Sequence, residues 1–241
     1  MANPLQQFEV KTLIPIHLGG VDASFTNASM FMMFAVAGVA TFLILSMRGR
    51  ALVPTRWQSM AELSYEFIAS MVRDNVGTEE RKYFPFIFSL FMFILFANLI
   101  GLLPYSFTFT SHIIVTFAMA IMIFLGVTVI GIVRHKLHFF SFFMPAGVPK
   151  IMAPILVPIE IVSYLSRPVS LSIRLFANMM AGHTMMKVFA GFVIPLGILG
   201  GWAPLAVDVA LTGFEFLVAF LQAYVFTILT CLYLNDAIHL H

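Results

Sequence analysis

Apolar residues form long stretches of the chain, and polar residues gather in the short segments between them. An apolar helix of about 20 residues can cross the hydrocarbon core of a bilayer. Four nearly uncharged stretches have this character: 27–48, 84–104, 111–134 and 190–207. The last of them contains Gly-Gly and two prolines. We interpret it as the connection between two longer helical regions, 149–192 and 203–237.

The two longer regions exceed what an upright span requires. Each has roughly 35–43 residues, which corresponds to roughly 50–65 Å of helix, whereas the hydrocarbon core is about 30 Å thick. Either both helices are continuous and steeply tilted, or each breaks into pieces. Pro154, Pro158 and Pro168 are candidates for kinking the first helix. We favour the tilted helical hairpin.

Residues 55–76 show a different, amphipathic pattern. Thr55-Arg56-Trp57-Gln58 fits a capping box at the start of a helix. Apolar residues then follow at helical spacing: Trp57, Met60, Leu63, Phe67, Ile68 and Met71. Charged residues lie between them: Glu62, Glu66, Arg73 and Asp74. This pattern is typical of a helix lying in the membrane interface; the alternative is a helix of a soluble loop that packs on a partner.

Composition supports a membrane protein. The chain has 61% hydrophobic and 10% charged residues, against about 25% charged in soluble domains. The net charge of +2 is too small to suggest a nucleic-acid partner, and the single Cys231 excludes an internal disulfide. No phosphate loop, HExxH motif or Cys pair indicates a cofactor or metal, and His135 and His138 are better interpreted as interface residues. We predict an all-α integral membrane protein forming one membrane domain over residues 1–241.

Basic residues near the span ends predict the orientation. They are Arg48, Arg50, Arg56, Arg81, Lys82, Arg134, Lys136 and Lys150. All lie on one side if residues 55–76 do not cross, and that side is cytoplasmic by the positive-inside rule. The N-terminus is then outside, and five crossings place the C-terminus in the cytoplasm. The loops at 104–112 and 193–203 fall outside, and neither contains Lys or Arg.

One polar stripe runs along the region 149–192. At 100° per residue, six residues lie within about 40° of Arg174: Glu160, Ser163, Arg167, Ser170, Asn178 and Ala181. A charge near mid-bilayer costs about 2.5–3.5 kcal/mol on insertion scales, and guanidinium cannot deprotonate to escape that cost. Arg174 therefore needs a carboxylate or water nearby. The alternative is a structural arginine paired to another helix.

The region 203–237 supplies carboxylates. Asp208, Glu215 and Gln222 are spaced by seven, so they share one helix face. Glu215 lies deep in an apolar run, where burial disfavours its charge and a nearby cation favours it, so it is a candidate for loading and releasing protons. The alternatives are a static salt bridge for Glu215 and a solvated residue at the outer end for Asp208.

His183 is a second candidate for proton relay, because the ordinary imidazole pKa lies near physiological pH. It is nine residues from Arg174 and so points to the opposite helix face. The alternative is a structural histidine. A short distance to Glu215 across the hairpin would favour the relay.

The segment PVSLSIRLFANMMAGH at 168–183 resembles the signature of the a subunit of F-type ATP synthases. PLQQFEVKTLIPI near the N-terminus, NLIGLLPYSFTFTSH and PIEIVSYLSRPVS resemble the same family. The resemblance covers nearly the whole chain, and its most specific part is the core formed by Arg174, Asn178 and Gly182.

The resemblance implies one upright span, an interfacial helix, an upright hairpin and a long tilted hairpin beside a ring of c subunits. It implies that Arg174 is the essential proton-translocation arginine facing the ring carboxylates. The outer half-channel would contain Glu215, His183, Asn178 and Gln222, with Asp208 toward the outer end. The cytoplasmic half-channel would contain Glu160, Ser163 and Ser170.

The family comparison also gives His183 and Glu215 a common role. Many bacterial members have Glu at the position of His183 and His at the position of Glu215, whereas this chain has the exchanged pair, as mitochondrial members do. The exchange indicates that the two positions are chemically coupled.

The predicted function is that of a proton-translocating stator subunit of a rotary ATP synthase, not catalytic alone, in a bacterial inner (plasma) membrane. Its expected partners are the c-subunit ring, b-type peripheral stalk subunits, the remainder of the complex and lipid. A secondary proton-coupled transporter is the alternative, although inverted repeats and broken helices are not evident. An intramembrane enzyme lacks a nucleophile and base, and a purely structural subunit leaves the stripe around Arg174 unexplained.

Overall fold

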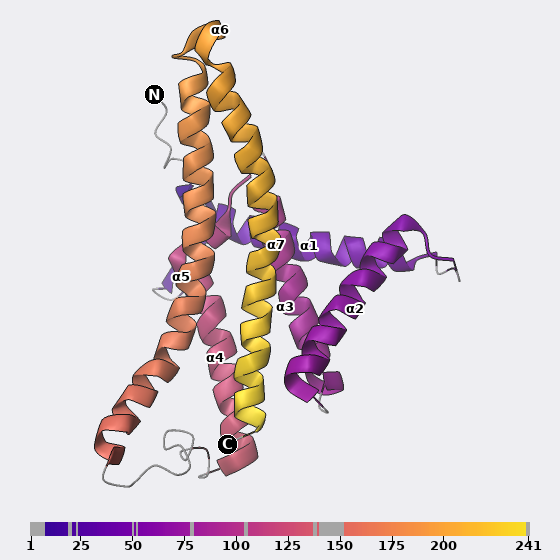
Figure 1. The fold of residues 1–241 in the computed structure, drawn as a ribbon, viewed down its shortest axis with the longest axis vertical. Coiled ribbons are helices and arrows are strands. Elements are labelled where there is room, and N and C mark those ends of the chain that lie inside the picture. The colour runs from indigo at the N-terminus through magenta and orange to yellow at the C-terminus, as the bar shows by residue number, and fades with distance from the viewer. Residues whose placement is uncertain are drawn as a thin grey trace.

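The computed structural model describes residues 8–18, 21–22, 24–49, 51, 53–77, 80–103, 106–136, 139 and 152–239. Most of them are helical (Figure 1). The long helices are α1 (Asn27–Met47), α2 (Arg56–Val76), α3 (Glu80–Gly101), α4 (Ile113–His135), α5 (Ala153–Val193) and α7 (Trp202–Ile238). Two short elements are η3 (Phe109–Ser111) and α6 (Gly197–Gly200). Arg50, His138 and Lys150, used in the sequence analysis, lie outside the described residues.

The prediction of an all-α integral membrane protein is confirmed. In the described part of the chain, α1, α3 from Arg81 onward, α4, α5 and α7 are long and apolar enough to cross a membrane. The short strands before α1 interrupt a segment for which the sequence pattern predicted no regular element. There β1 (Thr12–Ile14) pairs antiparallel with β4 (Phe25–Thr26), and β2 (His17–Leu18) pairs antiparallel with β3 (Val21–Asp22).

Asn27 ties this strand segment to the first turn of α1. Its backbone N–H donates to the carbonyl of Lys11 at 3.0 Å, and its side-chain oxygen accepts from the N–H of Lys11 at 3.1 Å. Its side-chain amide donates to the carbonyl of Glu9 at 3.2 Å. These hydrogen bonds hold the backbone of Glu9 and Lys11 against the first residue of α1.

The start of α2 carries half of the predicted capping box. The Thr55 hydroxyl accepts from the N–H of Gln58 at 3.4 Å, as an N-cap does. The Gln58 side chain does not return to Thr55. Its amide contacts both backbone groups of Ala51 at 3.3 and 3.4 Å and donates to Glu62 at 2.8 Å. Gln58 thus holds the incoming loop against the helix.

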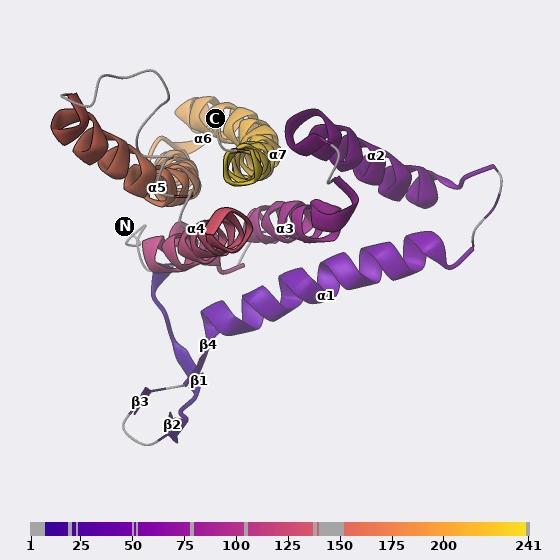
Figure 2. The same ribbon diagram turned by 90° about the horizontal axis from the view of Figure 1, so that it is seen from below.

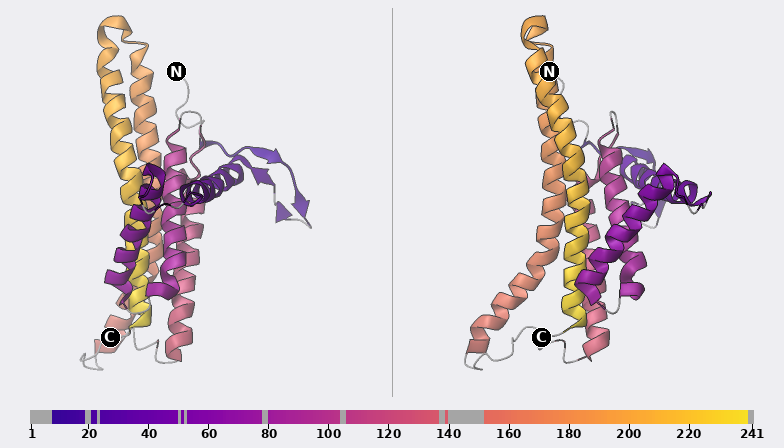
Figure 3. Two further views of the ribbon diagram at one scale, coloured as in Figure 1. Left: turned by 90° about the vertical axis from the view of Figure 1, so that its right-hand side faces the viewer. Right: turned by 45° about the vertical axis from the view of Figure 1, so that its right-hand side comes forward.

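The helices form three layers when the molecule is seen from below (Figure 2). α5 and α7 form a long antiparallel pair joined through α6, and α4 packs on α5 while α3 packs on α7. α1 packs on the far side of α3 and crosses it, whereas α3 and α4 run alongside the long pair (Figures 1 and 2). The α5–α7 hairpin projects beyond the other helices at its α6 end (Figure 3).

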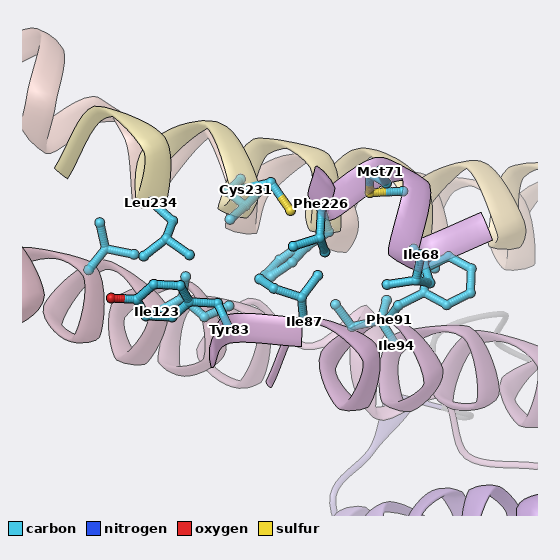
Figure 4. Close-up of a cluster of buried hydrophobic side chains, with 14 of the residues drawn as sticks. Ile68, Met71, Tyr83, Ile87, Phe91, Ile94, Ile123, Phe226, Cys231 and Leu234 are labelled. Carbon is cyan, nitrogen blue, oxygen red and sulfur yellow. The ribbon is translucent and has the colours of Figure 1, made fainter. Parts of the chain in front are cut away.

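The apolar core lies where α2, α3, α4, α5 and α7 meet; Figure 4 labels side chains that α2, α3, α4 and α7 contribute to it. Its fully buried side chains include Ile68, Ile87, Ile94, Phe226 and Leu234. Lipid is as apolar as these side chains, so the packing of their surfaces and a few polar contacts hold the helices together. One such contact joins the buried Asn98 of α3 to the carbonyl of Ala219 in α7, at 3.3 Å.

Glycines shape the corner between α5 and α7. Gly197 has φ +63°, in the left-handed region that side chains other than glycine disfavour. A Cβ on Gly201 would lie 2.6 Å from the carbonyl oxygen of Val193 and 2.7 Å from that of Gly197. This confirms that the Gly- and Pro-containing stretch connects two helices.

α5 and α7 have 41 and 37 residues, which corresponds to about 60 and 55 Å. Each is a single continuous helix. α5 bends in its N-terminal half (Figure 1), the part that contains Pro158 and Pro168. Proline removes a backbone donor and clashes with the preceding turn, which bends a helix without ending it. Both helices exceed the thickness of the hydrocarbon core.

Amphipathic α2 divides its apolar residues between two environments. Ile68 and Met71 are buried in the core, whereas Trp57, Met60 and Leu63 are 53–65% exposed. Trp57 and Met60 line an apolar groove of about 1040 Å³ between α1, α2 and α3. A helix that keeps large apolar side chains exposed beside charged ones suits a membrane surface.

Replacement of Phe226 by Ala should destabilise the protein by about 3 kcal/mol, because it leaves a cavity in the core between helices. The measurement is thermal unfolding of the chain in detergent. Phe216→Ala is the matched control on the same helix, since Phe216 is 49% exposed and Phe226 is 1% exposed. Equal loss of stability in the two variants would contradict this location of the core.

Candidate functional site

Arg174 lies in the middle of α5 with its side chain exposed. Within the described part of the chain it makes no ion pair or hydrogen bond, so the alternative of a structural arginine paired to another helix of the same chain finds no support. A permanently charged guanidinium on an apolar helix requires compensation. The surface around Arg174 therefore has to meet water or the carboxylate of another molecule.

The polar stripe predicted around Arg174 is only partly preserved. Ser163, Ser170, Asn178 and Ala181 are exposed like Arg174, and Glu160 is half-buried.

Arg167, which the helical wheel places in the same stripe, instead reaches toward α7. Its Nη1 lies 2.8 Å from Oδ2 of Asp236, and its guanidinium lies over the rings of Tyr233 and Tyr164, at 4.9 and 5.4 Å. The wheel placed Arg167 by angle alone, whereas its long side chain follows a carboxylate on the neighbouring helix. The stripe therefore contains one unneutralised arginine, not two.

Glu215 and His183 face each other between α7 and α5. Glu215 Oε2 lies 3.7 Å from His183 Nδ1, and the residues are 4% and 7% exposed. This is the short distance across the hairpin that favours a relay role for His183. The separation exceeds the 2.6–3.2 Å over which a proton transfers directly, so transfer requires closer approach or a bridging water.

Gly182 allows this approach. A Cβ built on Gly182 would contact Glu215 Oε1 and would lie 2.7 Å from Glu215 Cδ. The Glu215 carboxyl therefore packs directly against the backbone of α5, next to His183. Both Glu215 oxygens are buried and have no hydrogen-bond partner among the described residues. A carboxyl with free bonding capacity is available to a proton or to water.

Two cavities approach this pair from different sides. One, of about 640 Å³, is lined by Glu9, Lys11, Asn27, Ser106, Thr108 and His183, among others. The other, of about 420 Å³, is lined by Asn178, Gly182, Glu215 and Gln222 together with apolar residues. His183 borders only the first and Glu215 only the second. The contact between them thus lies between the two cavities.

The remaining predicted residues are placed as follows. Asp208, Glu215 and Gln222 occupy one face of α7, with Glu215 and Gln222 buried and Asp208 half-buried. Gln222 joins Asn178 and Glu215 in the second cavity, whereas Asp208 lies toward the α6 end of α7. Glu160 and Ser163 lie in the bent N-terminal half of α5, away from His183.

His112 lies between η3 and α4, outside the spanning helices. Burial lowers the pKa of its imidazole below the ordinary value, so the neutral form is favoured near pH 7. Its ring lies against that of Phe107, with centroids 5.1 Å apart. The segment that borders the larger cavity therefore gains no positive charge from His112.

Sequence reasoning missed Thr108 and Asp236. The buried Thr108 hydroxyl lies 2.9 Å from His183 Nε2, and Asp236 neutralises Arg167. Neither belongs to a periodic polar pattern. Asp236 sits in the last turns of an apolar helix, where a carboxylate is unusual, and that position was the available signal. Thr108 had no signal beyond its place in a segment resembling the family.

The chain matches the family model described as ATP synthase A chain over residues 29–235. The chain belongs to this family. Curated relatives named ATP synthase subunit a include proteins of Pelagibacter ubique, 59% identical over 99% of this chain and 98% of the relative, and Rhodospirillum rubrum, 57% identical over the full length of both. A third, from Agrobacterium fabrum, is 58% identical over 99% of both chains.

Membership of the ATP synthase A chain family confirms the predicted class of function. The family is the proton-translocating a chain of the membrane sector, so the protein is an ion-translocating subunit of an ATP synthase and not a catalytic one. The alternative of a secondary transporter is set aside, in agreement with the continuous helices α5 and α7.

Gly182→Ala should lower proton pumping by about tenfold or more, because the added methyl displaces Glu215 from His183, and lost alignment of reacting groups is costly. The measurement is ATP-driven acidification of inverted vesicles, normalised to assembled complex. Gly191→Ala is the matched control on the same helix, since a Cβ there has no neighbour within 4 Å. Wild-type pumping by Gly182→Ala would show that the contact between Glu215 and His183 is not needed for pumping.

Proposed function

We propose that this chain carries protons along two offset half-channels that open to opposite sides of the membrane, with Arg174 separating them. A proton from outside passes through the larger cavity, His183 and Glu215 to the cavity that contains Asn178 and Gln222. From there it neutralises a carboxylate of a neighbouring c-subunit ring. After the ring has turned, the proton leaves through a cytoplasmic half-channel beside Glu160, Ser163 and Ser170.

One observation carries this proposal. α5 presents Arg174 on an exposed face while His183 is buried against α7 on the other face. An exposed, uncompensated guanidinium favours the charged form of any carboxylate that passes it, and it opposes a proton crossing directly between the half-channels. The buried pair can pass a proton between two cavities. The two faces of α5 thereby keep the proton path through His183 apart from the positive charge of Arg174.

The cavities support the assignment of sides. The larger one is bordered by Glu9 and Lys11 of the N-terminal segment and by Ser106 and Thr108 before η3. Both segments are outside in the orientation that the basic residues predict. Asp208 lies nearer to the α6 end and is assigned to the outer path. The smaller cavity is lined by Asn178, which shares the exposed face of Arg174.

The same orientation places the basic helix ends in the cytoplasm. Arg48 follows α1, Arg81 lies at the start of α3 and Arg134 near the end of α4. The N-terminus is then outside and the C-terminus cytoplasmic, in the inner membrane of a bacterium. Helices as long as α5 and α7 fit the bilayer when they are steeply tilted, and the exposed apolar side chains of α2 suit the cytoplasmic interface.

The proposed partners follow from this arrangement. The ring of c subunits covers the α5 face that carries Arg174, peripheral stalk subunits of the b type hold the chain stationary, and lipid covers the exposed apolar surface. The driving force is the transmembrane potential, which contributes about 2.3 kcal/mol per charge per 100 mV. The protein binds no nucleotide, metal or nucleic acid in this scheme.

Arg174→Ala should abolish ATP-driven proton pumping, because the half-channels lose the charge that separates them and favours the deprotonated ring site. Acidification of inverted vesicles measures this, with immunoblotting to show that the complex still assembles. Ser166→Ala is a control on the same helix, since the Ser166 hydroxyl donates to a backbone carbonyl of its own turn. Full pumping by Arg174→Ala would refute the proposed function.

A cysteine at Ala181 should form disulfides with cysteines placed beside the ring carboxylate, because Ala181 is exposed on the Arg174 face. Ala40→Cys is the matched control, since Ala40 is exposed on α1, in the layer opposite α5 and α7. The native Cys231 is buried. The products are resolved by gel electrophoresis after oxidation. Equal yields at the two positions would contradict a ring on this face.

A further inference from the structure

The Thr108 side chain forms part of the wall of the larger cavity and connects two helices. Its hydroxyl donates to the carbonyl of Gly101, the last residue of α3, at 3.1 Å. The same oxygen lies 2.9 Å from His183 Nε2 in α5. A Cβ on Gly101 would lie 2.8 Å from the Thr108 methyl, so the missing side chain of Gly101 leaves room for this contact.

These contacts define the direction of the hydrogen bonds. A carbonyl only accepts, so the single hydroxyl proton of Thr108 is used in the bond to Gly101. The contact between Thr108 and His183 then requires Nε2–H as donor and the hydroxyl oxygen as acceptor. Nδ1 is left without a proton in the neutral imidazole, and Nδ1 is the atom that lies 3.7 Å from Glu215 Oε2.

This arrangement suits transfer between His183 and Glu215. A proton that reaches Nδ1 forms the imidazolium. It leaves when the Nδ1–H bond breaks and an O–H bond forms on the Glu215 carboxylate, while the electron pair remains on Nδ1. Both states of the imidazole keep Nε2–H bonded to Thr108. The ring therefore does not have to rotate to regain a buried hydrogen bond, which would otherwise be left unsatisfied.

We propose that Thr108 is a positioning residue of the outer proton path, whose hydroxyl accepts from His183 Nε2–H and thereby keeps Nδ1 facing Glu215. The inference rests on the proposed function and adds to it a residue from outside the two long helices. It gives the segment between α3 and η3 a role besides covering the cavity, because the hydroxyl links the backbone of α3 to the relay on α5.

Thr108→Val tests the role of the hydroxyl, since valine keeps the shape and removes the acceptor. ATP-driven acidification of inverted vesicles, per assembled complex, should fall by about tenfold, which corresponds to about 1.4 kcal/mol, within the range for a hydrogen bond lost by a buried group. Thr108→Ser keeps the hydroxyl, so its pumping should stay within about twofold of wild type. A twofold change corresponds to less than about 1 kcal/mol.

Thr110→Val is the matched control. Thr110 is fully buried in the neighbouring turn, and its hydroxyl oxygen has no hydrogen-bond partner among the described residues. It should pump at the wild-type rate. The proposal is overturned if Thr108→Val pumps like wild type, if Thr108→Ser is as impaired as Thr108→Val, or if Thr110→Val is equally impaired.

If Thr108→Val assembles poorly, a second pair of variants tests the role of the hydroxyl. Thr108→Ser and Thr108→Ala both lose the methyl, and only Thr108→Ala loses the hydroxyl, so the proposal predicts impaired pumping in Thr108→Ala alone. Equal pumping by these two variants overturns it. Arg174→Ala vesicles are measured in parallel. If they fail to pump while Thr108→Val pumps normally, this inference fails and the proposed function stands; pumping by Arg174→Ala refutes the proposed function itself.

Discussion

The charge of Arg174 is the constraint on which the rest of the site depends. Guanidinium stays protonated at any pH a protein experiences, and the described residues offer it no ion pair. A nearby arginine, Arg167, is paired with Asp236. The contrast shows that the fold can neutralise an arginine on α5 when a carboxylate lies opposite. At Arg174 the compensation has to come from water or from the carboxylate of another molecule.

Under the proposed function, the close contact between α5 and α7 provides a place to hold a proton behind that charge. Gly182 lets the Glu215 carboxyl reach the α5 backbone, where it meets His183. Arg174 and His183 point to opposite faces of one helix. Arg174 and the pair formed by His183 and Glu215 are thus close along the chain without being in contact, and each face has its own environment.

The other helices keep this hairpin in place. α3 and α4 run alongside α7 and α5, and the segment leading from α3 to η3 brings Thr108 to His183. In the C-terminal half of α4, the Thr128 hydroxyl lies 2.7 Å from the hydroxyl of Tyr164, in the bent half of α5. Because helix packing in lipid gains little from hydrophobic burial, such polar contacts act together with the close packing of side chains to hold the helices in place.

The pattern of apolar and polar residues predicted the membrane class, the number of long apolar helices and the corner between α5 and α7, and it singled out Arg174 and Glu215 as charged residues within apolar helices. Each follows from local properties: apolar length, turn residues and the cost of a charge in lipid. The wheel also separated Arg174 from His183 correctly, because helical geometry is regular over a few turns.

Which polar residues meet depends on how the helices pack against one another. The packing pairs Arg167 with Asp236, brings Glu215 to His183 over Gly182 and places the Thr108 hydroxyl 2.9 Å from Nε2 of the imidazole. Residues far apart in the sequence make these contacts, and their geometry depends on how helices cross and bend. The spacing of residues along one helix defines the faces of that helix but contains no information about the side chain that lies opposite.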